Sequence, residues 1–337
     1  MTALGSYVQY SVFRRDTRNA SGKAKYDVSD ILSRLGFAPM YTPSDKRALR
    51  IVQQWASIKR LPEDSLMAVQ YPANLDYFYR MLSKKQVESF AVIHDLESLR
   101  GGISLEEEVK TLGAFPAVIS HNDKMTAILR DGGYKGKIVE LGLFDYLAED
   151  EQVTSDREPN TIAFAGNLTK ASFLQELGSI PEIKFNVYGQ PTDAVENMPP
   201  NVSYKGSFPS EEIAQNIAGA WGLIWDGDSL ETCANQFGGY LKYNCPHKTS
   251  MYLVAERPVI TWSGAAIAEI VNQRGLGVTV DSLTELPKAI GNVSAADYQT
   301  MLDNVRVMKQ ELVRGEHLTT AVNKTLELLG EKKDRRR

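Results

Sequence analysis

The order of apolar and polar positions along the chain predicts strands that alternate with helices. This alternation occurs once in each half of the chain. Short apolar runs such as Ser89–Ile93 and Thr161–Ala165 are typical of strands buried on both faces. Between such runs, apolar residues recur three positions apart, as Leu49, Val52 and Trp55 do, which predicts helices. Strands that alternate with helices favour an α/β fold with parallel sheets covered by helices on both faces.

A polar stretch in the middle of the chain predicts how the alternation is divided. Residues Ala148–Asn160 are acidic and polar and contain Pro159, so they form the best linker candidate. We expect an N-terminal Rossmann-like domain over residues 1–152 and a C-terminal one over residues 153–315, with the two sheets facing across a cleft. Residues 316–337 would form a C-terminal helix and a basic tail that packs back on the first domain.

Parallel sheets bind ligands beyond the carboxyl ends of their strands. In this chain the rule points to six loops as candidate ligand-binding sites, and these loops hold most of the unusual polar residues. They follow Phe13, Ile93, Ala165, Tyr188, Trp225 and Trp262.

Three stretches of the sequence have residues that suit phosphate binding. The loop Tyr240–Lys248 runs into a helix with Lys248 near its start, where unpaired amides and the positive end of the helix dipole favour an anion. In Gly166–Lys170, a glycine allows close approach and Lys170 adds charge. Small residues at Gly264–Ala266 would let a ligand reach another helix start. The alternatives are a surface loop that caps an ordinary helix, a plain turn from strand to helix, and close packing of a helix on the sheet, respectively.

Other polar residues suggest proton transfer and hydroxyl binding. His94 and Asp95 follow a predicted strand, and either can act as a general base toward an alcohol. Asp226 of the Asp226–Asp228 turn can accept hydrogen bonds from ribose or sugar hydroxyls. The alternative for His94 and Asp95 is a pair that orders its own loop, and the alternative for Asp226 is a tight turn. The spacing of the third group matches no known zinc-binding motif, so these residues are interpreted as structural: Cys233, Cys245 and His247.

Composition narrows the class of protein. The chain has 337 residues and a net charge of −4, which argues against a nucleic-acid partner. No apolar run approaches the roughly 20 residues of a transmembrane helix, so we expect no stable membrane insertion. With two cysteines and no signal-peptide pattern at the start, a cytoplasmic location is expected.

Several of these motifs occur together in a known family. The chain resembles the glucosyltransferase 3-like (Gtf3-like) family of GT-B sugar-nucleotide transferases, which acts in serine-rich adhesin glycosylation and is similar to bacterial galactofuranosyltransferases. The resemblance extends from about Tyr7 to Leu329, and its most specific part is the loop that ends at Lys248. The shared motifs are His94–Arg100, Phe164–Leu168, Lys242–Lys248, Pro258–Ile260 and Gly275–Gly277.

The resemblance implies roles for individual residues toward a UDP-sugar. Lys248 would contact the diphosphate, in a pocket shaped by Tyr243 and Asn244. The residues beside the diphosphate would be Gly166, Asn167 and Lys170. Tyr188 and Gly189 would flank the uracil, and Thr17 and Asn19 would close over the donor from the other domain.

The activity implied by the resemblance is that of a UDP-sugar-dependent hexosyltransferase. It would move glucose from UDP-glucose to an acceptor sugar such as O-linked GlcNAc on a serine-rich repeat glycoprotein, as a homo-tetramer or dimer. No cofactor is expected, and the transfer would be metal-independent. UDP-galactofuranose and UDP-GlcNAc remain alternative donors, for cell-surface polysaccharide synthesis. An alternative of another class is a two-domain protein that binds a small ligand without chemistry.

Overall fold

The computed structural model describes residues 7–10, 20–40, 47–62, 65–73, 79, 84–85, 87–148, 153–235 and 238–334. Its contacts divide the chain into two compact units. Unit 1 comprises Met1–Asp16, Ala24–Leu141 and Glu316–Arg337. Unit 2 comprises Thr17–Lys23 and Gly142–Gly315.

The described strands of unit 1 form a six-stranded sheet with the order β2-β1-β3-β4-β5-β6, and every pairing is parallel. The strands are β1 (Tyr7–Tyr10), β2 (Ala38–Pro39), β3 (Leu66–Tyr71), β4 (Glu88–Ile93), β5 (Ala117–Ser120) and β6 (Lys137–Glu140). All residues of β3 and β5 are buried. Such fully buried and mostly apolar strands are typical of a parallel sheet that helices cover on both faces.

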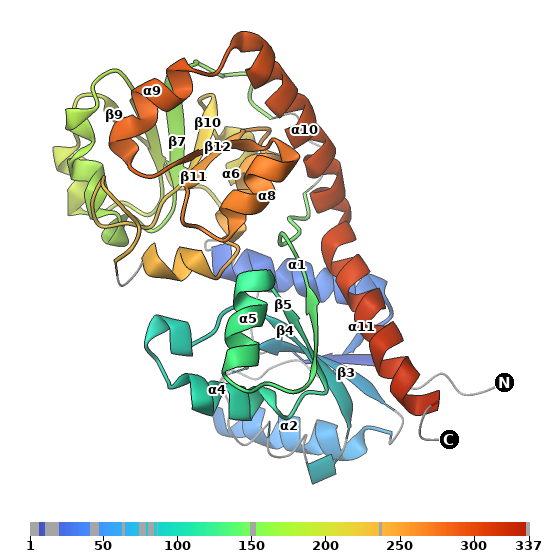
Figure 1. Ribbon diagram of the computed structural model, residues 1–337. Coiled ribbons are helices and arrows are strands. Elements are labelled where there is room, and N and C mark those ends of the chain that lie inside the picture. Colours follow the sequence, from blue (N-terminus) through green and yellow to red (C-terminus); the bar gives the residue numbers. More distant parts are fainter. Residues whose placement is uncertain are drawn as a thin grey trace. The chain divides into compact units, whose positions relative to one another are not determined.

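Helices of unit 1 lie on both sides of these strands. Figure 1 shows α2 and α4 together on one side and α1 on the other. The helices are α1 (Ala20–Arg34), α2 (Arg47–Arg60), α4 (Leu105–Leu112), α5 (Asp123–Asp131) and α11 (Glu316–Asp334). The start of α1, through Lys23, is assigned to unit 2. The sequence Ser104–Glu107 predicts a capping box, and α4 has one, since the Ser104 hydroxyl accepts from the Glu107 amide and the Glu107 carboxylate accepts from the Ser104 amide. Helix α11 packs on β5 and β6.

Unit 2 has its own six-stranded parallel sheet, with the order β12-β11-β10-β7-β8-β9. The strands are β7 (Thr161–Ala165), β8 (Lys184–Tyr188), β9 (Val202–Gly206), β10 (Trp221–Ile224), β11 (Val259–Trp262) and β12 (Gly277–Val280). Read from β9, this is the 3-2-1-4-5-6 order of the Rossmann fold, whose order reverses between β7 and β10.

The helices of unit 2 follow its strands in chain order (Figure 1). They are α6 (Ile213–Asn216), α7 (His247–Val254), α8 (Ile267–Arg274), α9 (Leu286–Gly291) and α10 (Ala295–Arg314). Between β7 and β8 the chain forms 3₁₀ turns over Leu168–Lys170, Ser172–Gln175 and Leu177–Ser179. A connection between two parallel strands commonly contains an α-helix, and the sequence suggests one near Phe173, but this described connection has only 3₁₀ turns. Gly178 and Pro181 lie close after Phe173, and both residues disfavour a longer helix.

The division between the units falls before the predicted linker. Leu143, Phe144 and Tyr146 are buried and belong structurally to unit 2, so the chain enters that unit ahead of Ala148. Leu143 and Tyr146 are members of its apolar core. Among the described helices, none combines the length and the apolar character that crossing a bilayer requires.

Candidate functional site

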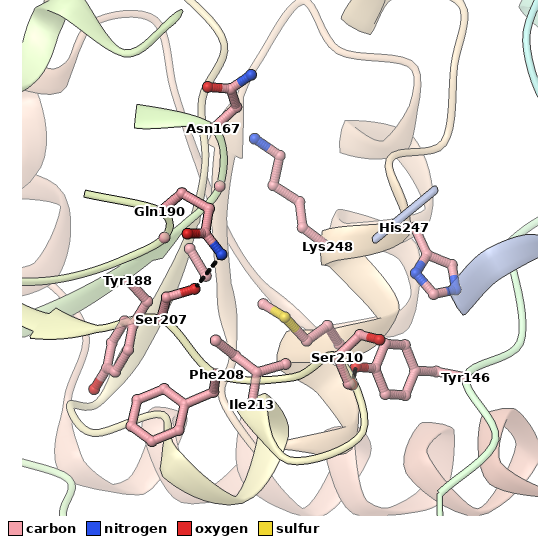
Figure 2. Close-up of a pocket in the computed structure, with 14 residues that line it drawn as sticks. Tyr146, Asn167, Tyr188, Gln190, Ser207, Phe208, Ser210, Ile213, His247 and Lys248 are labelled. Carbon is pink, nitrogen blue, oxygen red and sulfur yellow. Dashed lines mark hydrogen bonds between the residues drawn. The ribbon is translucent and has the colours of Figure 1, made fainter. Parts of the chain in front are cut away.

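A cavity of about 450 Å³ lies at the carboxyl ends of strands in unit 2. The loops after β7, β8 and β9 supply much of its wall, and α7 supplies another part (Figure 2). Ile213 of α6 and Tyr146, which precedes β7, complete the wall. The residues that line it are Tyr146, Ala165, Gly166, Asn167, Tyr188, Gly189, Gln190, Ser207, Phe208, Ser210, Ile213, His247, Lys248 and Met251. Its volume is in the range of small-molecule sites.

The loops after β7 and β8 meet at the cavity wall. The Gly166 amide donates to the Tyr188 carbonyl at 3.1 Å. Gly189 has a φ of +153°, and a Cβ at that position would lie 2.3 Å from the Gly166 carbonyl oxygen. Only glycine therefore permits this approach. The Asn167 side chain accepts from the Thr169 amide at 3.0 Å, which fixes the turn that follows β7.

Lys248 projects into the cavity from the first turn of α7. Figure 2 shows its side chain extending toward Asn167. Its amine lies 2.5 Å from an Asp226 carboxylate oxygen and 5.4 Å from the centre of the Phe164 ring. The residue before the helix is Pro246, whose side chain has no acceptor to cap the first amides. The start of α7 thus combines an ammonium group with amides that suit an anion.

The opposite part of the cavity is less polar. Phe208, Ile213 and Met251 contribute apolar surface there, and Figure 2 shows the first two at the end away from Asn167. Between the two ends, the Gln190 amide donates to the Ser207 hydroxyl at 3.0 Å. This pair leaves an amide oxygen that can still accept a hydrogen bond from a planar polar ligand.

Tyr146 and His247 form a side of the cavity that the sequence did not predict. Their rings stack with centroids 5.0 Å apart, and the Lys23 amine lies 4.6 Å from the Tyr146 ring centre. Burial, followed by the nearby Lys23 charge, lowers the pKa of His247 to about 3, so its imidazole is neutral. His247 was interpreted as structural because its spacing fits no metal site. Its position directly before Lys248 was the available signal.

The structure brings together part of the predicted donor-binding set. Gly166, Asn167, Tyr188, Gly189 and Lys248 line the cavity, and Asp226 pairs with Lys248. The Tyr188 hydroxyl is engaged elsewhere, because it accepts from the Ala218 amide at 2.9 Å. The roles of these residues toward a ligand stay predictions.

Other predicted residues lie outside the lining. Lys170 is exposed at the end of its 3₁₀ turn. The remaining ones are Tyr243, Asn244, Gly264, Ala265 and Ala266. At the predicted helix start, the Ala265 amide donates to the Trp262 carbonyl and the Ala266 amide to the Leu241 carbonyl. Thr17 and Asn19 fall outside the described residues.

The two catalytic candidates lie in unit 1, after β4. His94 is buried, and its Nε2 lies 2.7 Å from the Gln70 amide oxygen. Asp95 pairs with Arg100 at 2.8 Å and remains partly exposed. The buried Glu108 carboxylate accepts from the amides of Glu97 and Ser98, which holds the loop that follows Asp95. The catalytic role of His94 and Asp95 stays a prediction.

Comparison with known proteins identifies the family. Models of the glucosyltransferase 3-like N-terminal and C-terminal domains match residues 8–143 and 162–325. The chain belongs to the glucosyltransferase 3-like family. This agrees with the expected family and makes the protein a glycosyltransferase, which decides against a binding protein without chemistry.

Individual relatives support this family assignment. This chain is 30% identical to the β-1,6-galactofuranosyltransferase WbbI of Escherichia coli K12. The match covers 92% of this chain and 95% of WbbI. It is also 36% identical to glucosyltransferase 3 of Streptococcus gordonii, over 32% of this chain and 31% of that protein.

The fold is that of GT-B glycosyltransferases. The crystal structure of Anabaena Alr3699/HepE in complex with UDP and glucose matches with a TM-score of 0.59 at 11% identity. The match covers 96% of this chain and 99% of that one. The predicted fold class, α/β with two Rossmann-like domains, is thereby confirmed.

Proposed function

We propose that the protein is a UDP-sugar-dependent hexosyltransferase that holds its donor in the cavity of unit 2. The observation that carries the proposal is the arrangement around Lys248. Its ammonium group and the uncapped start of α7 share one end of the cavity with Gly166 and Asn167. Backbone amides and a lysine at a helix start suit a diphosphate.

The nucleobase is proposed to lie beside Gly189, with the Gln190–Ser207 pair facing its polar edge. Uracil presents a ring N–H and two carbonyl oxygens, which an amide and a hydroxyl can pair with. Support comes from the geometry of the pair, which lies between the charged end and Phe208 in the cavity lining. Asp226 would accept hydrogen bonds from hydroxyls of the ribose or the transferred sugar.

The proposed chemistry follows from the charges. The bond between the anomeric carbon and the β-phosphate oxygen breaks, and an acceptor hydroxyl oxygen forms the new bond to that carbon. UDP leaves with increased negative charge, which Lys248 and the helix amides stabilise without rearrangement. If the configuration inverts, Asp95 or His94 takes the acceptor proton.

The transferred sugar distinguishes two versions of the proposal. Galactofuranose is favoured by the relative that matches nearly the whole chain. Glucose, moved to an O-linked GlcNAc on a serine-rich repeat glycoprotein, is favoured by the family name and by streptococcal relatives that match shorter parts. We rank galactofuranose first because its relative aligns over both units.

Calorimetric titration with UDP tests the site. Lys248→Ala is expected to weaken UDP binding roughly 10- to 100-fold, as for the loss of a charged hydrogen-bond donor. Lys242→Ala is the matched control, since Lys242 is exposed in the same loop but does not line the cavity. Equal affinities of the two variants for UDP would refute the proposed site.

The donor is tested by measuring UDP release with each sugar nucleotide. The protein is incubated with UDP-galactofuranose, UDP-glucose or UDP-GlcNAc and with glycan or glycopeptide acceptors. Acceptor-dependent release with UDP-galactofuranose alone supports the first version, and release with UDP-glucose and a GlcNAc acceptor supports the second. Release with UDP-GlcNAc alone would contradict both.

Two further expectations complete the proposal. Transfer is proposed to be metal-independent, so the rate in EDTA should equal the rate in magnesium. The protein is proposed to assemble as a homo-tetramer or dimer, which light scattering coupled to gel filtration measures. A rate lost in EDTA, or a monomer at all concentrations, would contradict the respective expectation.

A further inference from the structure

One face of α2 in unit 1 exposes large apolar side chains in a row. Leu49, Val52 and Trp55 are 52%, 61% and 47% exposed, respectively. Each step of three residues shifts the side chain by about 60° around the helix, so these three fall within an arc of about 120°. Ile58, by contrast, is buried in the core of unit 1. Among the described residues, only Ile103 and Val307 are also large, apolar and exposed, and they lie on other segments.

The same helix carries positive charge. Its sequence contains Arg47, Arg50, Lys59 and Arg60 and neither aspartate nor glutamate. The Lys59 amine lies 3.7 Å from the centre of the Trp55 ring, and Arg60 is exposed. This local excess stands out because the whole chain has a net charge of −4.

Exposed tryptophan beside lysine on a basic, amphipathic helix is the pattern of segments that lie in a bilayer interface. We propose that α2 docks unit 1 onto an anionic lipid bilayer. Leu49, Val52 and Trp55 would enter the boundary between headgroups and acyl chains. Lys59 and Arg60 would remain at the level of the lipid phosphates, because long basic side chains extend toward them.

Charge favours a bilayer over a second copy of this chain. A two-fold interface through α2 would bring the same helix of both copies together, and with it two identical sets of cations. Like charges at an interface oppose association, whereas anionic lipid supplies the complementary charge. Such docking is peripheral and requires no membrane-spanning helix.

Trp55 offers a direct probe. All four tryptophans lie in the described part of the chain, and Trp221, Trp225 and Trp262 are buried. The full-length protein is mixed with vesicles of phosphatidylcholine containing phosphatidylglycerol, and with vesicles of phosphatidylcholine alone. With anionic vesicles the protein should co-sediment and its tryptophan emission should shift to the blue. High salt should reduce the binding.

Two matched pairs of variants identify the surface. Val52→Asp should lower the bound fraction at least about tenfold, whereas Val307→Asp should leave it unchanged. Both valines are 61% exposed on helices, Val307 in unit 2. Lys59→Glu should weaken binding by at least about fivefold, since each basic residue near the surface contributes about that much. Lys288→Glu, an exposed lysine of α9, is the charge control.

Unchanged UDP binding and unchanged melting temperature show that the variants fold. Equal vesicle binding by Val52→Asp and Val307→Asp would overturn the proposal, as would no binding by the unaltered protein. A dimer in solution that Val52→Asp dissociates, without vesicle binding, would overturn it in favour of self-association. These outcomes are independent of whether Lys248 binds UDP.

Discussion

The two units contain sheets of the same kind but with different strand orders. In unit 1 the order reverses between β1 and β3, as in flavodoxin-like folds, and in unit 2 between β7 and β10. Asn167 follows β7, and Lys248 belongs to the helix that follows β10. The cavity residues therefore come from both sides of the reversal, where an open α/β sheet leaves room for a ligand.

The polar residues of the two units also differ in what they contact. In unit 2, Lys248 and Asn167 face the cavity. In unit 1, Gln70 contacts His94, Arg100 pairs with Asp95, and Glu108 binds backbone amides. Polar residues at strand ends thus mark the functional edge of a sheet, while their neighbours decide whether they face open space or each other.

The close approach of two loops in unit 2 predicts the largest effect. Gly189→Ala should lower the free energy of unfolding by about 4 kcal/mol, because its Cβ would overlap the Gly166 carbonyl. Gly133→Ala in unit 1 is the control, with a positive φ but no atom within 4 Å, and should cost about 1 kcal/mol. Urea unfolding measures both. Equal costs would show that backbone conformation alone, and not the contact, requires Gly189.

A buried histidine in unit 1 predicts the next largest effect. Burial lowers the pKa of His121 from 6.5 to about 4, and its Nε2 lies 3.0 Å from the Ile93 carbonyl oxygen. As the pH falls below 6.5, the unfolded chain binds this proton before the native one does. Stability should therefore drop by about 3 kcal/mol between pH 6.5 and 4.

Urea unfolding at several pH values measures this dependence. In His121→Gln, the drop in the free energy of unfolding between pH 6.5 and 4 should be smaller by that amount. An identical pH dependence in both proteins would rule out His121 as its source.

The ion pair at the cavity predicts a smaller change. In Asp226→Asn, Lys248 loses its carboxylate partner and is free to meet the diphosphate. UDP should then bind up to about fivefold more tightly, as for a partly exposed pair. Sugar transfer should nevertheless fall, because Asp226 is proposed to hold a hydroxyl. Titration with UDP and the rate of UDP release separate the two effects. Weaker UDP binding would contradict the competition and indicate that Asp226 holds a hydroxyl of the ribose instead.

A helix cap predicts the smallest effect. Ser104→Ala removes the capping box of α4 and should cost about 0.5 to 1 kcal/mol in the free energy of unfolding. UDP binding should not change. A weaker affinity for UDP in this variant would show that unit 1 contributes to the binding site, contrary to the contrast drawn above.

Local patterns in the sequence were enough to predict much of the fold. The run Ser89–Ile93 is buried as β4, and Ser104 with Glu107 caps α4, because burial on both faces and capping act between near neighbours. Lys248 and the Gly166–Asn167 turn were also predictable, since strand ends bind ligands and a helix start attracts an anion.

Other features were decided only when distant segments met. Tyr146 precedes the predicted linker by position, yet it stacks on His247 in the cavity. Gln190 and Ser207 form their pair because β8 and β9 are adjacent in the sheet. On α2, the spacing of Leu49, Val52, Trp55 and Ile58 predicts one helix and places Ile58 about half a turn from Leu49. Only packing against the core decides that the side with Ile58 is buried and the side with the other three is exposed. Periodicity fixes which side chains share a face, whereas burial depends on what the rest of the chain places against that face.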